Sequence, residues 1–413
     1  MKIKGYDMLN VISSGSYTKV YRVLKTTKKT GPKFFAFKRM KLSEEGITIA
    51  MVRELHFLAT LKHANIVKVE KMFYAKHSFC VVMEMYPHDL EYYIDKLTLP
   101  QIHSVTLQIV SVLSHLHDLD IAHRDVKFEN FLVKSNGNDL TVFLCDFNLS
   151  VQVNEGDQDV SVGTFYYRSP ELVEDEPNPF ASTELDCWSL GCMIAEMLTR
   201  ELLFDAQDDE QLAGWHKLYF ASIEADGTSP IICHRIDPEF LETDERPQSN
   251  LFVTTELSKA MFKLLRPLED RATMKDIYKL LMGTEFAPEG EKLPHYPNLP
   301  VELVTPANGP NLSRFLDCFE DPDDRYLVTV LSEPTRRLYA KFLATGGKDE
   351  SVGRDVDQET LLYACLDLVA KFFLSDELFG FDDYNFWCGK RMDPYAFELM
   401  QVEVMKRVEY RIV

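Results

Sequence analysis

The segment from His123 to Asn130 constrains the fold of this chain more than any other part of the sequence. It follows an apolar run at helical spacing, and within it Asp125 and Asn130 lie five residues apart. A strand-like run over 140–144 then leads into Asp146. Carboxylate and amide oxygens are ligands that Mg²⁺ accepts. Asn130 and Asp146 are therefore candidate Mg²⁺ ligands. The spacing of five from Asp125 to Asn130 is that of a loop in which the aspartate orients a reacting hydroxyl while the asparagine reaches the metal.

A lysine and a glutamate upstream form a second candidate pair. Lys38 ends a strand-like run, where its long side chain could present an ammonium group to phosphate. Glu54 falls at helical spacing with Met51, Leu55 and Leu58, so these four residues would share one helix face. A carboxylate inside an apolar stripe requires a cation, and Lys38 is the candidate. A solvated lysine at the end of a strand is the alternative.

Hydrophobic periodicity divides the first part of the chain into a β-rich and an α-rich region. Short strands are predicted over 6–40, and a helix over 48–61. Further strands are predicted over 66–69 and 79–85, and helical spacing takes over from residue 102.

The Pro-rich stretch 288–310 has neither period and predicts a linker. Helical spacing returns beyond it, and we expect helices over 335–343, 359–374 and 395–408. The most apolar of these contains Asp367 and Lys371 and is not a membrane span.

The overall charge and the cysteines indicate which binding partners and which cellular compartment to expect. A formal net charge of −20 argues against nonspecific binding to nucleic acid and favours basic protein segments as partners. The eight cysteines are scattered without a CxxC pair, which favours buried thiols in a reducing compartment. The N-terminal residues lack an apolar signal core. We therefore expect a cytoplasmic or nuclear protein that binds neither membrane nor nucleic acid directly.

These segments together resemble the protein kinase family. The resemblance continues in order through Gly163-Thr164, Ser169-Pro170-Glu171, Asp186-Cys187-Trp188-Ser189-Leu190-Gly191 and Arg271. It implies an α+β bilobal fold, with a small β-rich N-lobe over 1–86 and a large helical C-lobe over 87–286. It also implies a protein-serine/threonine kinase that uses ATP and Mg²⁺. The most similar subgroup is the cyclin-dependent kinases, because Tyr166–Glu171 resembles their WYRAPE segment and Arg53-Glu54 lies in a run that takes the place of their cyclin-binding helix.

The resemblance gives each matching position an expected role. The catalytic residues would be Asp125, Lys127, Lys38 and Glu54, and the metal ligands Asn130 and Asp146. The residues expected to contact ATP are Ile12, Ser13, Ser14, Gly15, Ser16, Tyr17, Thr18, Val20, Ala36, Lys38, Met83, Glu84, Tyr86 and Asp89. Glu171 should pair with Arg271, and Asp186 should anchor the catalytic loop from inside the large lobe.

The nucleotide loop and the metal motif depart from the family pattern. Only Gly15 remains of three family glycines, since Ser13 and Thr18 take the other places. Glycine allows close approach of backbone to phosphate, so this loop should be stiffer. Asn148 replaces the glycine of the DFG motif, and asparagine tolerates left-handed backbone better than most residues. A binding scaffold whose kinase fold no longer turns over therefore remains an alternative. Ser16 and Tyr17 fall where cyclin-dependent kinases carry an inhibitory Thr-Tyr pair, so Tyr17 is a candidate site of inhibitory phosphorylation; surface hydroxyls at a loop tip are the alternative.

The activation segment also differs. Asp159 stands where cyclin-dependent kinases carry an activating threonine, so it could pair with Arg53 and Arg124 in place of a phosphate; one more charge on an acidic loop is the alternative. Lys127 and Thr164 are typical of serine/threonine kinases. Arg168 matches the arginine that makes related kinases select proline after the target residue, and proline lacks the amide that would go unpaired. Proteins with Ser/Thr-Pro sites are the expected substrates.

The C-terminal residues resemble a single cyclin box. An all-α module is expected over 312–413, joined by a linker over 287–311. Lys371 matches a lysine that cyclins use near the kinase helix, and Gln401 takes the place of its glutamate partner. The resemblance implies a cyclin-like partner, either attached in the same chain or separate. An ordinary helical extension, or a module that binds another protein, are the alternatives.

Overall fold

The structure is a computed structural model. It describes residues 2–15, 17–27, 31–42, 46–153, 163–173, 182–223, 255–283, 358–373 and 394–407, and single positions 229, 232, 335, 338, 339, 342 and 410. The described residues belong to two compact units. The first draws on 1–61, 68–85 and the chain from 292 onward, and the second on 62–67 and 86–291.

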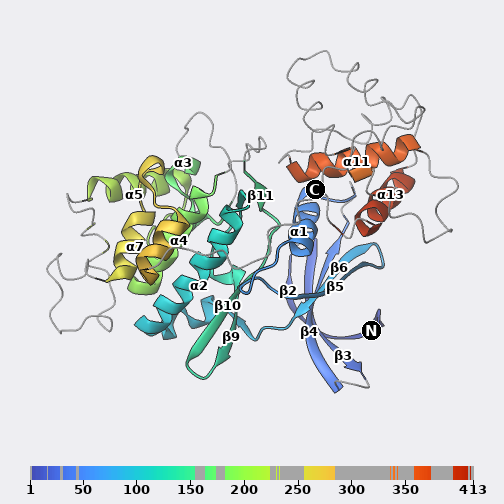
Figure 1. The fold of residues 1–413 in the computed structure, drawn as a ribbon, viewed down its shortest axis with the longest axis horizontal. Helices are drawn as coiled ribbons and strands as arrows, with labels where there is room; N and C mark the ends of the chain where they lie inside the picture. The colour runs from blue at the N-terminus through green and yellow to red at the C-terminus, as the bar shows by residue number, and fades with distance from the viewer. Residues whose placement is uncertain are drawn as a thin grey trace, which may run out of the picture. The chain divides into compact units, whose positions relative to one another are not determined.

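The first unit is built on an antiparallel six-stranded sheet with the order β1-β2-β3-β4-β6-β5 (Figure 1). The strands are β1 (Lys2–Ile3), β2 (Tyr6–Ser14), β3 (Thr18–Thr27), β4 (Gly31–Lys41), β5 (Val69–Tyr74) and β6 (Ser78–Glu84). One face carries a buried cluster of Ile3, Tyr6, Val23, Phe35, Phe37, Phe73, Cys80 and Val82. Because side chains alternate along a strand, Lys38 lies on the opposite face from Phe37.

Three helices accompany this sheet. Helix α1 (Ile49–Thr60) begins where the Thr48 hydroxyl accepts a hydrogen bond from the Met51 backbone at 3.4 Å. Helices α11 (Gln358–Phe373) and α13 (Pro394–Arg407) pack against each other. Helix α11 also contacts α1, and α13 contacts β5. The apolar positions that predicted α11 and α13 are thus the ones buried within this unit.

The second unit is mainly helical. Its helices are α2 (Leu99–His117), α3 (Pro170–Val173), α4 (Glu184–Thr199), α5 (Asp209–Ala221), α7 (Glu256–Leu264) and α8 (Met274–Met282), with 3-10 turns η1 (Glu91–Lys96), η2 (Phe128–Asn130), η3 (Phe165–Tyr167) and η6 (Leu268–Asp270). Its short strands are β7 (His88–Asp89), β8 (Ile121–Ala122), β9 (Phe131–Asn136), β10 (Asp139–Leu144) and β11 (Val151–Gln152). Trp188 of α4 is fully buried at its centre. A side chain at Gly191 would come within 2.9 Å of Leu265, so glycine permits α4 and α7 to pack closely.

Most predicted elements are confirmed to within one residue, and one strand is wrong in its limits. The helices predicted over 48–61, 359–374 and 395–408 are α1, α11 and α13. The strand predicted over 66–69 begins only at Val69, because Ile66 forms an isolated bridge with Leu144 in the second unit. The linker over 287–311 and most of the helix over 335–343 lie outside the described residues. Among those described, no helix is long and apolar enough to cross a membrane.

Candidate active site

Lys38 and Glu54 form a close ion pair in the first unit. Nζ of Lys38 lies 2.5 Å from Oε1 of Glu54, and the two side chains are 12% and 4% exposed. Glu54 occupies a helix face that also buries Met51 and Leu55, so its carboxylate has been removed from bulk water. A desolvated carboxylate is stable only with a partner of opposite charge. The pair holds the Lys38 ammonium over one face of the sheet.

That face also carries the predicted adenine contacts of this unit. Val20 lies directly across from Lys38 on β3, and Ala36, two residues before Lys38, lies across from Met83 on β6. Ala36 and Met83 are nearly buried. Together they offer a flat apolar surface beside the lysine. Glu84 follows on β6, whereas the predicted contacts Tyr86 and Asp89 belong to the second unit.

The glycine-poor loop joins β2 to β3 in a tight turn. The backbone N–H of Gly15 donates to the carbonyl of Thr18 at 2.8 Å, and Ser13 pairs with Val20 just after a register shift between Val11 and Ser13. A side chain at Gly15 would approach nothing closer than 3.8 Å, and its φ is not positive. The sheet therefore accommodates side chains where the family has glycine. Ile12, Ser14 and Tyr17 are exposed, Thr18 is half-buried, and Ser16 lies outside the described residues.

In the second unit, Asp186 of α4 fixes the backbone of the loop from His123 to Asn130. Its two carboxylate oxygens accept hydrogen bonds from the backbone N–H groups of His123 and Arg124, each at 2.8 Å. Nε2 of His117 lies 3.0 Å from Oδ2. Burial alone would raise the pKa of this carboxyl group, but the bonds from His117 and His123 outweigh burial and lower it. Asp186 therefore anchors the loop as an ionised group, as the resemblance implied.

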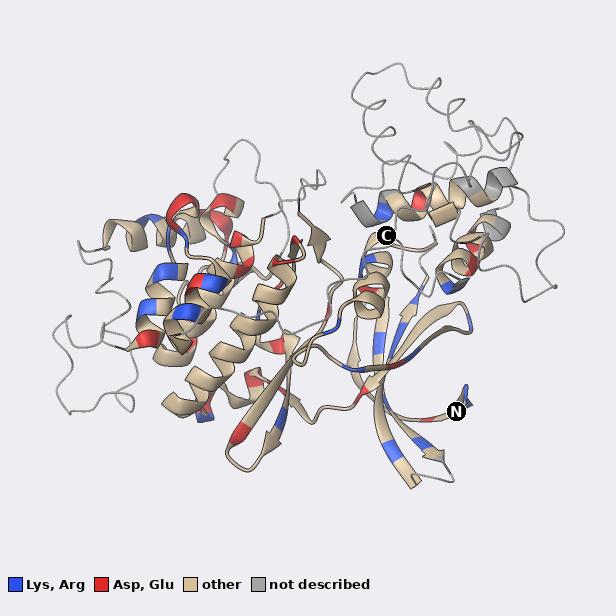
Figure 2. Ribbon diagram, viewed as in Figure 1, with Lys and Arg blue, Asp and Glu red and all other residues tan. Residues whose placement is uncertain are grey.

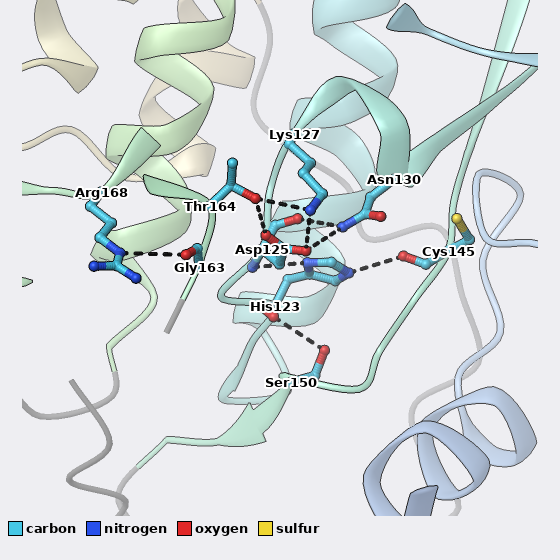
Figure 3. Close-up of polar contacts among 9 residues, drawn as sticks. All are labelled: His123, Asp125, Lys127, Asn130, Cys145, Ser150, Gly163, Thr164 and Arg168. Carbon is cyan, nitrogen blue, oxygen red and sulfur yellow. Dashed lines mark hydrogen bonds and ion pairs between the residues drawn. The ribbon is translucent and has the colours of Figure 1, made fainter. Parts of the chain in front are cut away.

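Asp125 lies at the centre of a connected set of polar contacts (Figure 3). Its Oδ2 is 2.9 Å from both Nζ of Lys127 and Nδ2 of Asn130, and its Oδ1 accepts a 2.8 Å hydrogen bond from the hydroxyl of Thr164. Lys127 also donates to the Thr164 hydroxyl at 2.9 Å. Asp125 is 8% exposed. The structure thus brings the predicted catalytic aspartate together with the lysine and threonine that lie 2 and 39 residues further along the sequence.

Asn130 and Asp146 are the two predicted metal ligands. Nδ2 of Asn130 donates to the backbone carbonyl and the side chain of Asp125, so the Oδ1 atom is left to accept. The backbone N–H of Cys145 donates to the carbonyl of Asn130 at 2.9 Å, which holds the residue before Asp146 against the loop. An amide oxygen and a carboxylate are hard ligands, and Mg²⁺ takes its remaining ligands from water and substrate phosphates. The donor set fits Mg²⁺.

The unusual backbone of the metal motif lies at Asp146 and not at Asn148. Asp146 has φ of 63°, whereas Asn148 does not have positive φ. Asn148 therefore does not need the tolerance of asparagine for left-handed backbone in this structure. Phe147 is fully buried, and its ring meets the His123 ring edge to face at 5.4 Å. The substitution of glycine by asparagine does not prevent this arrangement of the motif.

The last part of the activation segment, from Gly163 to Glu171, lies beside the loop that contains Asp125. Gly163 has φ of 81°, and a side chain there would lie 2.9 Å from the carbonyl oxygen of Arg124, so only glycine fits. Nε of Arg168 donates to the Gly163 carbonyl at a long 3.4 Å, and its Nη1 lies 3.6 Å from Asp209. Asp159 lies outside the described residues. Arg53 and Arg124, its predicted partners, are both buried.

Two buried polar pairs support this region. Arg271 forms two hydrogen bonds with Glu171, at 2.6 and 3.0 Å, as the resemblance implied. Sequence reasoning missed the second pair, in which the Tyr167 hydroxyl donates to Glu196 at 2.8 Å. Burial raises the pKa of Glu196 to about 7, although the bond from Tyr167 opposes that shift. A glutamate within an otherwise apolar helix was the signal that could have revealed it.

The C-terminal helices contain a buried network that differs from the predicted one. Lys371 lies 2.9 Å from Asp367, one turn earlier on α11, and Gln401 of α13 donates to the same carboxylate. Asp367 was not singled out from the sequence, although it interrupts an apolar run. A side chain at Gly46, three residues before α1, would lie 3.9 Å from Gln401. The network therefore sits close to the start of α1.

Comparisons with known proteins agree with this geometry. Residues 6–279 match the protein kinase domain family. The serine/threonine-protein kinase ppk23 of Schizosaccharomyces pombe is 33% identical over 217 residues, which is 50% of this chain and 52% of that protein. Cyclin-dependent kinase G-2 of Oryza sativa subsp. indica is 34% identical over 218 residues, covering 50% and 30%. A probable cell division protein kinase of Encephalitozoon cuniculi is 33% identical over 212 residues, covering 50% and 76%. The chain thus spans about half of the first relative and less than a third of the second.

Proposed function

The chain belongs to the protein kinase family, and from that premise we propose that it is an active serine/threonine kinase that transfers the γ-phosphate of ATP to a protein hydroxyl. The observation that carries this proposal is the set of contacts around Asp125, in which Lys127, Asn130 and Thr164 all converge on one carboxylate.

In the proposed reaction, the substrate hydroxyl attacks the γ-phosphorus, a new P–O bond forms, and the bond to the ADP oxygen breaks. Asp125 orients the hydroxyl and accepts its proton. Lys127 places a positive charge beside the transferred group, and Lys38, held by Glu54, is the residue that would reach the α- and β-phosphates. Asn130 and Asp146 would hold Mg²⁺, which neutralises the developing phosphate charge when bound.

We further propose that substrates carry proline after the target residue. The support is Arg168, whose Nε approaches the Gly163 carbonyl that would otherwise accept the backbone N–H of that next residue. A backbone N–H without an acceptor is costly to bury, and proline has none.

The expected result is that a Ser-Pro peptide has a kcat/KM at least about tenfold above that of the matched Ser-Ala peptide. An Arg168→Ala variant should bring the ratio toward one, because it frees the Gly163 carbonyl. The measurement is steady-state phosphorylation of both peptides by the full chain. Equal use of the two peptides by the unaltered chain would refute proline direction without touching the kinase proposal.

We also propose that helices α11 and α13 act as an attached, cyclin-like activator of α1. The support is the packing of α11 on α1 and the position of the Lys371–Asp367–Gln401 network near the residues that precede α1. The Tyr410 ring packs edge to face against Phe79 of β6 at 6.2 Å, and the Lys406 ammonium lies 5.6 Å from the Tyr74 ring centre. Burial raises the pKa of Tyr410 to about 12.

Replacing Tyr410 by alanine in the full chain should therefore lower kcat/KM by about tenfold, because loss of a buried aromatic contact costs more than about 1 kcal/mol. Tyr410→Phe should retain nearly full activity, since the ring contact and not the hydroxyl makes the packing. Unchanged activity of Tyr410→Ala would contradict cis activation.

Asp159 remains our proposed substitute for an activating phosphate.

A further inference from the structure

The positive charge of this acidic chain is concentrated at one end. Residues 1–86 contain 16 Lys or Arg residues and six Asp or Glu residues, although the whole chain contains 45 and 65. Figure 2 shows blue segments spread over the strands of the first unit. This part of the chain therefore has a net positive charge, whereas the protein as a whole is negative. It creates a region of positive electrostatic potential on an otherwise acidic protein.

The strand register places many of these cations on one face of the sheet. Lys19 lies directly across from Arg39, and Lys25 across from Lys33, in the same alternation as the buried pairs Tyr21–Phe37 and Val23–Phe35. Lys41 follows Arg39 on the same face, and Lys71 of β5 lies across from the buried Val82. We define the basic face by its six cations, Lys19, Lys25, Lys33, Arg39, Lys41 and Lys71. It is opposite to the face that carries Lys38.

Few anions balance this face. Glu70 lies 3.3 Å from Lys25, and the register puts Glu84 at one end, across from Phe35. Among the residues that the structure describes, no carboxylate lies within ion-pair distance of Lys19, Lys33, Lys41 or Lys71. Like charges directly across a pair of strands destabilise a sheet. The basic face has two such pairs, Lys19 with Arg39 and Lys25 with Lys33. Their repulsion disfavours folding, and binding of an anion would reduce that repulsion.

The aromatic rings under the basic face indicate which kind of polyanion fits. Lys25 and Lys33 lie 5.2 and 5.0 Å from the ring centres of Tyr6 and Phe35, and Lys71 lies 5.8 Å from that of Phe73. These rings are 1%, 3% and 9% exposed. Single-stranded nucleic acids are bound through exposed rings on which bases stack, and these rings are covered by lysine. Arg39 already donates to the Ser78 hydroxyl and the Lys76 carbonyl.

We propose that the basic face is a docking surface for an acidic segment of a protein partner, rich in Asp and Glu. Flexible, hydrated lysine ammonium groups suit a carboxylate-rich segment, because they need no planar or bidentate geometry. None of the six cations is a predicted catalytic or nucleotide contact. The docking proposal does not depend on whether the chain transfers phosphate.

The test is direct binding of a fluorescein-labelled peptide of roughly 20 glutamates to the full chain, followed by anisotropy at about 0.05 M and about 0.3 M salt. The unaltered chain should bind, and higher salt should weaken binding. Lys19→Glu combined with Lys33→Glu should weaken it by at least about tenfold. The matched control is Lys259→Glu with Lys263→Glu, two exposed lysines of α7, which makes the same change in net charge and should alter binding by less than about twofold.

The double variant is chosen so that misfolding cannot imitate the expected loss. Each new glutamate lies across from a cation, Arg39 or Lys25, so a repulsive pair becomes an attractive one. The melting temperature should be unchanged or higher. Absence of peptide binding to the unaltered chain, or an equal loss in the α7 control, would overturn the proposal. Tighter binding of a single-stranded oligonucleotide of equal charge would also overturn it and assign the face to nucleic acid.

Discussion

Replacing Asp125 by asparagine should lower kcat by a factor of about 10² to 10⁴, the range that a general base contributes. The amide has nearly the same shape as the carboxylate, but it can neither accept a proton nor hold the Lys127 ammonium as an ion pair, which now spans 2.9 Å. KM for ATP should change little, because Asp125 is not a predicted nucleotide contact. The measurement is initial-rate phosphorylation of a Ser-Pro peptide.

Asp139→Asn provides the matched control for that experiment. Asp139 is an exposed carboxylate at the start of β10, and its neutralisation changes the net charge by the same amount. The control variant should keep full activity. Retention of more than about a tenth of kcat by Asp125→Asn would mean that Asp125 is not the base.

Replacing Arg271 by methionine should destabilise the second unit by about 3–5 kcal/mol, the usual cost of breaking a buried ion pair. The Arg271 side chain is fully buried, and its two bonds to Glu171 measure 2.6 and 3.0 Å. The variant leaves the Glu171 carboxylate without its partner in a largely buried place. Urea unfolding of the full chain, followed through tryptophan fluorescence, to which the buried Trp188 of this unit contributes, measures the loss.

Two further variants separate the ion pair from general effects of substitution. Lys275→Met removes an exposed lysine that pairs with Asp118 and should cost less than about 1 kcal/mol. Arg271→Met combined with Glu171→Leu should cost less than Arg271→Met alone, since no uncompensated charge remains. If the double variant is as unstable as the sum of the single ones, the pair does not contribute as described.

The parts of the site that could be predicted from sequence are those fixed by short spacing. Lys127, Asn130 and Asp125 lie within one loop, so their mutual contacts follow from a local turn. The Lys38–Glu54 contact was predictable because helical period put one carboxylate inside an apolar stripe. The Glu171–Arg271 pair spans 100 residues, and only the family resemblance indicated it.

The features that escaped prediction depend on contacts between distant segments. Nothing local to Glu196 identifies Tyr167 as its partner, and nothing local to Asp367 indicates that it joins Lys371 to Gln401. The left-handed backbone at Asp146 is likewise imposed by its surroundings. The residue types alone had suggested Asn148 instead, because asparagine tolerates this conformation. The basic face was hidden by a net charge of −20, because a sum over the chain conceals how charge is distributed between the two faces of a sheet.

The most direct test of the account is phosphate transfer by the purified full chain from Mg-ATP to a Ser-Pro peptide, beside Asp146→Asn prepared in the same way. Asp146 is one of the two proposed cation ligands, so its neutralisation should abolish transfer while the chain stays folded. The unaltered chain should transfer phosphate, and the variant should show no transfer above background. Absence of transfer by the unaltered chain, or equal transfer by both proteins, would contradict it.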